Sequence, residues 1–265
     1  MRRAAAAVIV FAASAVSIGF LVLPVVAIFA RVSPGRLVSQ LGNGVVTDAL
    51  VVSLETTALA QALILVLGTP TASLLARRFR GRELLVTLVE LPLVLPPAVA
   101  GLGLLAAFGS TGLLQTHLPF TRGAVVVAVA FVASPLYVRG AIAAFEAVDA
   151  DVVAASRTLG AGPARTFFRV VLPLARDGLA AGAALSFARG LGEFGATIMF
   201  AGSLRGVTQT LPLAVYSEFA EDFDVALAVS ALLVVVSAAL LVTLRLVLQW
   251  QPSRPTSRFR FALSR

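Results

Sequence analysis

The chain has 265 residues, of which 59% are hydrophobic and only 13% are charged, whereas a soluble domain carries about 25% charged residues. The net charge is +8, the basic residues are all arginine because lysine is absent, and cysteine is absent as well. This composition indicates a membrane protein and excludes a Walker-type phosphate loop, disulfides, thiolate metal sites and cysteine nucleophiles, and the single histidine, His117, excludes a histidine-based metal cluster.

Six segments are apolar over the ~20 residues that an α-helix needs to cross the hydrocarbon core of a bilayer. In chain order they cover residues 4–30, 49–76, 84–108, 123–143, 178–201 and 225–248. The apolar run of the first segment exceeds the ~7–15 residues of a signal-peptide core, so we expect a retained helix. The sequence therefore predicts an all-α integral membrane protein with a single transmembrane domain over 1–250 and a cytoplasmic tail over 251–265.

The second and third segments contain acids and prolines. Pro92, Pro96 and Pro97 are expected to kink or break the third helix, because proline removes a helical hydrogen bond. A charge at the centre of a span costs about 2.5–3.5 kcal/mol and faces protein or water. We interpret Glu55 and Glu90 as structural residues whose charges face protein or water and not lipid.

Arginine is unevenly distributed among the loops. The loops and ends expected on one side of the membrane carry sixteen arginines, and the opposite side carries four. Because basic residues concentrate on the cytoplasmic side, both termini are expected in the cytoplasm. The same bias accounts for the net charge, so we expect no nucleic-acid partner. On the opposite side, His117, Arg122 and the acids within 218–224 are interpreted as solvated loop residues.

A long loop over 145–177 separates the fourth and fifth segments and has helical character of its own. Apolar residues recur at helical spacing from Glu146 to Leu159, with acids near the start, where they suit the helix dipole. Gly160 should stop this helix, and Pro163 should open a second one that Pro173 ends. Such a helical pair either packs against its own bundle or docks on a cytoplasmic partner.

The residues of this loop carry a family resemblance. Ala154-Ala155-Ser156, then Gly160, then Val170-x-Leu172-Pro173 resembles the coupling loop of ABC-importer permeases, with alanine at 154 where that family often has glutamate. The stretches RTLGAGPARTFFRVVLPLA, RGLGEFGATIMFAG and TQTLPLAVY are most similar to molybdate/tungstate permeases. Sulfate/thiosulfate permeases share the GEFG core and are the alternative.

This resemblance implies a type I ABC-importer permease of six spans in the cell membrane that takes up an oxyanion by alternating access. It implies a homodimer, two copies of a cytoplasmic ATPase that hold ATP and Mg, and an extracytoplasmic oxyanion-binding protein. The chain itself is expected to bind no cofactor or metal and to catalyse no reaction. The residues expected to couple it to the ATPase are Ala154, Ala155, Ser156, Arg157, Gly160, Ala161, Arg165 and Pro173.

The fifth segment contains polar residues three or four positions apart. Gly182, Ser186, Arg189, Glu193 and Thr197 would form one stripe on a continuous helix. Gly192 and Gly195 lie off the stripe and would offer a smooth face for close helix packing. The stripe is either an ion pair satisfied within the bundle or the lining of a hydrated path or dimer seam. We favour the path or seam for Ser186, Arg189, Glu193 and Thr197.

The charge of Glu193 limits its role. A bare carboxylate within a few ångströms would repel an oxyanion, so we expect Glu193 to hold Arg189 or a backbone group instead of binding substrate. An intramembrane enzyme that uses Glu193 with Arg189 is a weaker alternative, because no nucleophile–base or metal set accompanies them. A scaffold or sensor without transport is the third class.

Overall fold

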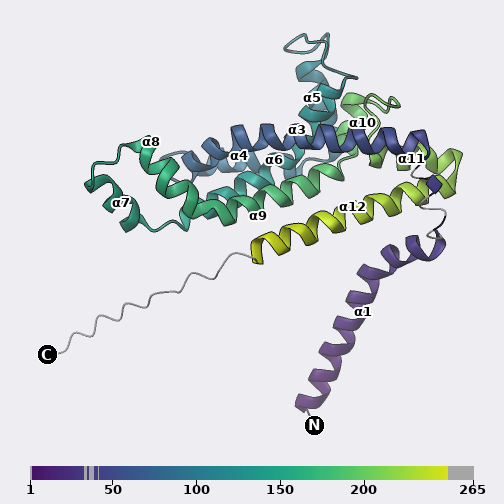
Figure 1. Cartoon of the computed structure of the whole chain (residues 1–265), viewed down its shortest axis with the longest axis horizontal. Helices are drawn as coiled ribbons and strands as arrows, with labels where there is room; N and C mark the ends of the chain where they lie inside the picture. The colour runs from purple at the N-terminus through teal and green to yellow at the C-terminus, as the bar shows by residue number, and fades with distance from the viewer. Residues whose placement is uncertain (1, 33–34, 36–38, 41, 250–265) are drawn as a thin grey trace.

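The computed structural model describes the chain except for residues 1, 33–34, 36–38, 41 and 250–265, so the expected tail over 251–265 lies outside the described residues. Every regular element of the described residues is helical (Figure 1). The elements are α1 (Arg2–Arg31), α3 (Gly44–Leu75), α4 (Arg82–Val94), α5 (Pro97–Phe108), α6 (Arg122–Glu146), α7 (Ala150–Thr158), α8 (Pro163–Thr166), the π-helical turn η1 (Phe167–Val171), α9 (Leu172–Leu191), α10 (Gly195–Ala201), α11 (Leu211–Glu221) and α12 (Phe223–Gln249).

The centre of the bundle is α6, which packs most extensively against α3 and α9. Its buried face is rich in alanine and valine, and small residues let helix backbones approach closely in a membrane. Where two glycines meet, a Cβ built on Gly140 of α6 would lie 3.1 Å from the Cα of Gly182 on α9. The three helices therefore form the central packing unit of the bundle.

Five described helices are long and apolar enough to cross a membrane, and a sixth span is made if the bent pair α4 and α5 counts as one. The prediction of an all-α membrane fold is therefore confirmed. The third span differs from a kinked helix over 84–108, because α4 and α5 meet at 113°. Leu95 and Pro96 are extended because each precedes a proline, and Pro97 then opens a new helix.

The prediction of the fifth span over 178–201 is wrong at both ends. The helical run from α8 through η1 to α9 covers Pro163–Leu191, so Pro173 does not separate a loop helix from the span. In η1, the Leu172 N–H bonds to the carbonyl of Phe167, so a wide π-turn directly precedes Pro173. In a regular α-helix the Pro173 ring would clash with the Arg169 carbonyl four residues earlier. The span then stops at Leu191, and α10 begins after a break at Gly195.

The first helix stands apart from the bundle. In Figure 1, α1 leaves the bundle beside α12, its one substantial neighbour among the described helices. Its span over Ala6–Arg31 is strongly apolar, yet none of it is buried inside the chain. The α1 surface therefore faces either lipid or another protein chain.

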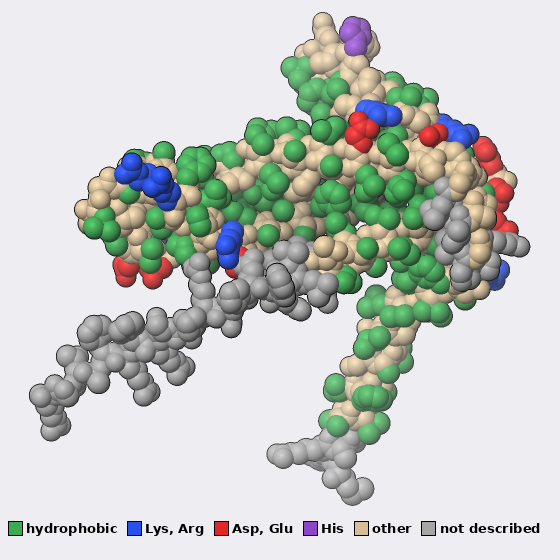
Figure 2. Space-filling view, viewed as in Figure 1, with side chains coloured by type: hydrophobic (Ala, Val, Ile, Leu, Met, Phe, Trp, Pro, Cys, Tyr) green, Lys and Arg blue, Asp and Glu red, His purple; other side chains and the backbone are tan. Residues whose placement is uncertain are grey.

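Charged side chains lie mostly toward the two ends of the bundle. Figure 2 shows them over the α7–α8 end and over the α11 end, with a hydrophobic surface between. At the α11 end, Arg122 pairs with Glu55 at 2.6 Å and donates to the Gly206 carbonyl. Nearby, burial and the charges of Glu221 and Asp222 raise the pKa of Glu218. Arg122 is therefore part of an interhelical link and is more than the solvated loop residue that was expected.

Candidate functional site

The segment between α6 and α9 protrudes from one end of the bundle (Figure 1). Glu146 is the last residue of α6, which corrects the helix predicted from Glu146 to Leu159. After a break, the Asp149 side chain accepts from the Asp151 N–H at 2.8 Å and caps α7. A short run between two helices thus presents α7 at an angle to the bundle.

Gly160 ends α7 in a left-handed conformation, with φ of +84°. The Gly160 N–H bonds to the Arg157 carbonyl and the Ala161 N–H to the Ser156 carbonyl, which is the Schellman pattern of a helix C-terminus. Pro163 then opens α8, as its sequence position predicted. The turn between α7 and α8 is therefore fixed by backbone hydrogen bonds.

Thr166, which the sequence analysis did not single out, holds the two short helices together. It is 2% exposed, and its hydroxyl lies 3.2 Å from that of Ser156 on α7. Behind it, the rings of Phe145 at the end of α6 and Phe167 in η1 pack with centroids 6.0 Å apart. The segment is thus one folded unit anchored on α6 and α9. We name residues 147–171 the coupling segment, after the role that the sequence predicts for them.

Most of the predicted coupling residues are brought together on the outside of this unit. Ala154, Ala155, Arg157, Gly160 and Arg165 are exposed, and Ser156 and Ala161 are half-buried. Pro173 is also exposed but lies in the continuous helix beyond the unit.

Leu159 was missed by the sequence analysis. It lies at the C-cap of α7 and is 88% exposed. A signal for it existed in the sequence, since a leucine directly before a helix-ending glycine lies at the tip of a turn.

The predicted polar stripe is split by the break after α9. Ser186 and Arg189 lie on α9, Glu193 lies in the break, and Thr197 lies on α10. Glu193 forms an ion pair with Arg189 at 2.7 Å, and its side chain is 1% exposed. Its other carboxylate oxygen accepts from the Ala196 N–H at 2.8 Å and satisfies the first turn of α10. One buried carboxylate therefore joins the ends of two helices.

The two glycines near this break differ in their surroundings. A Cβ on Gly195 would lie 2.3 Å from the Pro97 Cβ, so α10 approaches the start of α5 as closely as backbone allows. A Cβ on Gly192 would meet only carbonyls of its own helix, at 3.9 and 4.0 Å. Gly192 therefore ends α9 and packs against no other helix within the described residues, contrary to the expected smooth face.

A second row of polar residues faces the stripe from α3. Ser53, Thr57 and Gln61 are spaced four residues apart and share one helix face. The Ser186 hydroxyl donates to Gln61 Oε1 at 2.9 Å, and Ser53 Oγ accepts from the Leu211 N–H of α11 at 2.7 Å. We name this contact between α3, α9 and α11 the polar seam. The α3 side of the polar seam could not be predicted from the sequence. Hydroxyl side chains in an apolar helix often bond to carbonyls of their own helix, so their presence does not indicate a contact with another helix.

The polar seam has spare hydrogen-bonding capacity. Gln61 Nε2 and the side-chain oxygens of Gln209 and Thr210 are buried without a partner among the described residues. Buried polar groups are nearly always paired with protein or water. Water or a polar solute can therefore complete the bonding of such atoms.

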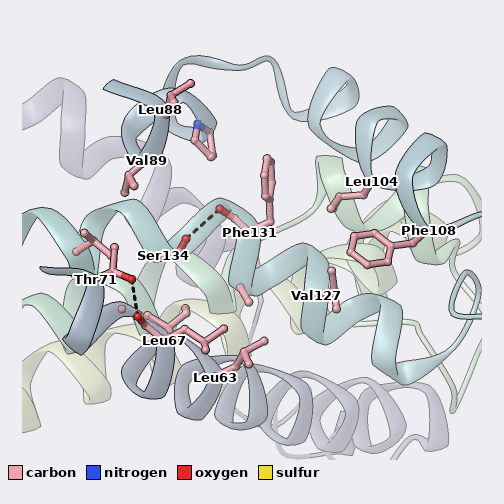
Figure 3. Close-up of a pocket in the computed structure, with 15 residues that line it drawn as sticks. Leu63, Leu67, Thr71, Leu88, Val89, Leu104, Phe108, Val127, Phe131 and Ser134 are labelled. Carbon is pink, nitrogen blue, oxygen red and sulfur yellow. Dashed lines mark hydrogen bonds between the residues drawn. The ribbon is translucent and has the colours of Figure 1, made fainter. Parts of the chain in front are cut away.

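An apolar pocket of about 430 Å³ lies between α3, α4, α5 and α6 (Figure 3). Its lining is hydrophobic except for Thr71 and Ser134. Both hydroxyls bond carbonyls of their own helices, at Leu67 and Phe131. With no free donor and no cation in its wall, this cavity is unsuited to an oxyanion.

These features define a multi-span helical membrane protein with broken helices, an internal polar seam and a folded unit protruding at one end. A family model described as the inner membrane component of binding-protein-dependent transport systems matches residues 64–254. The chain belongs to this family, and it is a multi-pass transport component of the cell membrane and not an enzyme.

Similar proteins cover most of the chain. It is 44% identical over 228 residues to the molybdenum transport system permease protein ModB of Mycobacterium tuberculosis, covering 83% of this chain and 86% of that protein. It is 42% identical over 230 residues to a probable molybdenum ABC transporter permease of Haloferax volcanii, covering 84% of both. Among solved structures, the inward-facing MetNI methionine ABC transporter shares the fold, with a TM-score of 0.63 at 18% identity over 77% of this chain and 95% of that one.

Proposed function

We propose that the chain is the membrane-spanning subunit of an ATP-driven importer of molybdate and tungstate. The observation that carries the proposal is the 44% identity to a molybdenum permease over 83% of the chain. The polar seam agrees with this chemistry, because Gln61 Nε2 and the Thr210 hydroxyl are buried donors without a partner among the described residues. The one buried acid there, Glu193, is occupied by Arg189 and the Ala196 N–H.

The coupling segment is proposed to dock on a cytoplasmic ATPase, which binds the ATP and Mg. Its fixed turn presents Leu159, 88% exposed, beside exposed Ala154, Ala155 and Arg157. An apolar tip with an adjacent cation suits a groove on a protein surface. This assignment places the α7–α8 end and both termini in the cytoplasm, and the α11 end toward an oxyanion-binding protein.

The working unit is proposed to be a homodimer with two ATPase copies. The apolar span of α1 is wholly unburied within one chain and stands off the bundle. A second copy gives this helix a protein surface and places two polar seams in one assembly. Alternating access then follows from rigid-body movement of the two bundles, driven through the coupling segments.

The test is co-purification of the chain with its ATPase, followed by ATP hydrolysis in the presence of the binding protein. Hydrolysis is expected to rise when the binding protein is loaded with molybdate or tungstate and to stay low with sulfate. Stimulation by sulfate alone would assign the chain to sulfate import. Absence of any associated ATPase would contradict the transport assignment.

A further inference from the structure

Arg82, the first residue of α4, connects three helix ends near the coupling segment. Its Nε donates to the carbonyl of Leu75, the last residue of α3, at 2.6 Å. One terminal nitrogen contacts Glu83 on its own helix at 2.8 Å, and the other contacts Glu146, the last residue of α6, at 2.5 Å. The guanidinium thus bonds α3, α4 and α6 at the same time.

This cluster is more than an isolated surface pair. The Arg82 side chain is 22% exposed, while that of Glu146 is 47% exposed. An exposed single pair contributes about 0–1 kcal/mol, but a planar guanidinium that bonds three acceptors on three helix ends also sets their geometry. The Leu75 carbonyl adds a favourable interaction, since the C-terminus of a helix carries partial negative charge.

Glu146 connects the Arg82 cluster directly to the coupling segment. Glu146 ends α6, and the coupling segment begins at the next residue, with the α7 cap Asp149 close behind. On its other side, the coupling segment runs without interruption into α9 and so to the Glu193 break. No continuous helix joins it to α3 or α4, which carry the Gln61 side of the polar seam and a wall of the apolar cavity.

We propose that Arg82 is a positioning residue that transmits movement of the coupling segment to α3 and α4. The inference rests on the proposed function, because it assumes that an ATPase moves this segment. Without the Arg82 link, α9 follows the ATPase while α3 lags behind it. ATP hydrolysis then continues, but fewer hydrolysis events open the path.

The experiment measures ATP hydrolysed per molybdate ion taken up, in proteoliposomes that contain the full importer and its binding protein. We expect Arg82→Gln to raise this ratio roughly fivefold, the lower range of coupling between linked sites. Glu146→Gln should act in the same direction, and the double variant should be no worse than Arg82→Gln alone. Arg80→Gln is the matched control, because Arg80 is an exposed arginine of the same turn without an ion pair in the described part of the chain.

A merely structural role gives a different result. If Arg82→Gln lowers uptake and hydrolysis together and leaves their ratio unchanged, the inference is overturned. Additive effects of the two single variants would also overturn it, because Arg82 and Glu146 would then act independently.

A second measurement separates this inference from the proposed substrate. The chain has no cysteine. Two introduced cysteines, Leu74→Cys on α3 and Asp151→Cys on α7, therefore provide the only spin-labelling sites in this chain. With the ATPase bound, ATP should leave the distance between the labels unchanged in the parent chain and alter it in Arg82→Gln. An equal response in both would refute the link, while absent molybdate uptake by the parent chain would refute only the proposed function.

Discussion

The Glu193 carboxylate lies 2.7 Å from the Arg189 guanidinium and spans the break between α9 and α10. Its second oxygen holds the Ala196 N–H, so both oxygens are occupied. A buried carboxylate fully engaged in this way fixes the angle between two helices. The break therefore has a defined geometry although it contains Gly192 and is followed directly by Gly195.

Replacing Glu193 with glutamine should alter transport while the importer still assembles. Glutamine keeps an oxygen for the Ala196 N–H but loses the charge that faces Arg189. The expected loss of stability is about 1–3 kcal/mol, because a partly buried cation loses its partner. Thermal unfolding and uptake in proteoliposomes measure the two effects. Normal uptake together with normal stimulated ATP hydrolysis would contradict this role.

Gly160→Ala should weaken coupling to the ATPase. The residue has φ of +84°, and a side chain in the left-handed region costs about 1–2 kcal/mol. The strain is expected to displace the Leu159 tip and reduce ATPase association several-fold in a pull-down. Gly162→Ala is the control, because Gly162 has φ of −66° and equally open surroundings. Equal effects of the two substitutions would show that backbone conformation is not the cause.

Gly195→Ala should destabilise the bundle by about 1–3 kcal/mol, the cost of overpacking a tight contact. The added Cβ would lie 2.3 Å from that of Pro97 and force α10 away from α5. Gly103→Ala on α5 provides the comparison, since nothing lies within 4 Å of its Cβ position. Thermal unfolding in detergent should separate the variants, and an unchanged midpoint for Gly195→Ala would rule out the close contact.

Leu159→Ser should leave the fold intact and weaken ATPase binding. The side chain is 88% exposed, so its replacement changes surface chemistry without opening the core. Leu113→Ser, 87% exposed in the loop after α5, is the matched control at another part of the molecule. Binding of the purified ATPase should fall about tenfold for Leu159→Ser, as expected for a central apolar contact worth ~1.4 kcal/mol. Equal binding by both variants would remove Leu159 from the docking surface.

Glu218 predicts a pH-dependent effect at the α11 end. Its raised pKa, caused by burial and then by Glu221 and Asp222, means that ionisation destabilises the folded chain. Glu218→Gln should therefore stabilise modestly near neutral pH, and this gain should disappear as pH falls below the unfolded pKa of about 4.3. Unfolding midpoints at several pH values test this, and a gain that grew on acidification would contradict it.

The sequence predicted the helical membrane fold because apolar length alone identifies a span. Gly160 and Pro163 also marked the turn between α7 and α8 correctly, since their backbone preferences are local. The helix end predicted at Pro173 was wrong, because a π-turn before this proline accommodates it and the sequence does not predict such a turn. The polar stripe was divided for a related reason: Glu193 caps a new helix, and helical spacing cannot distinguish a cap from a mid-helix position.

The α3 side of the polar seam and the Arg82 cluster were not predicted. Gln61 meets Ser186, and Arg82 meets Glu146, across long separations in the chain. Such pairs depend on how α3, α6 and α9 pack, and no local pattern specifies that packing. Small residues such as Gly140 and Gly182 predict that a helix is crossed closely by another, but they do not predict which helix crosses it.

The central claim is tested most directly by uptake of radiolabelled molybdate into proteoliposomes that contain this chain, its ATPase and the loaded binding protein. We expect uptake that requires ATP and the binding protein, is competed by tungstate and is unaffected by excess sulfate. Molybdate uptake that sulfate abolishes, or no uptake despite stimulated ATP hydrolysis, would contradict it.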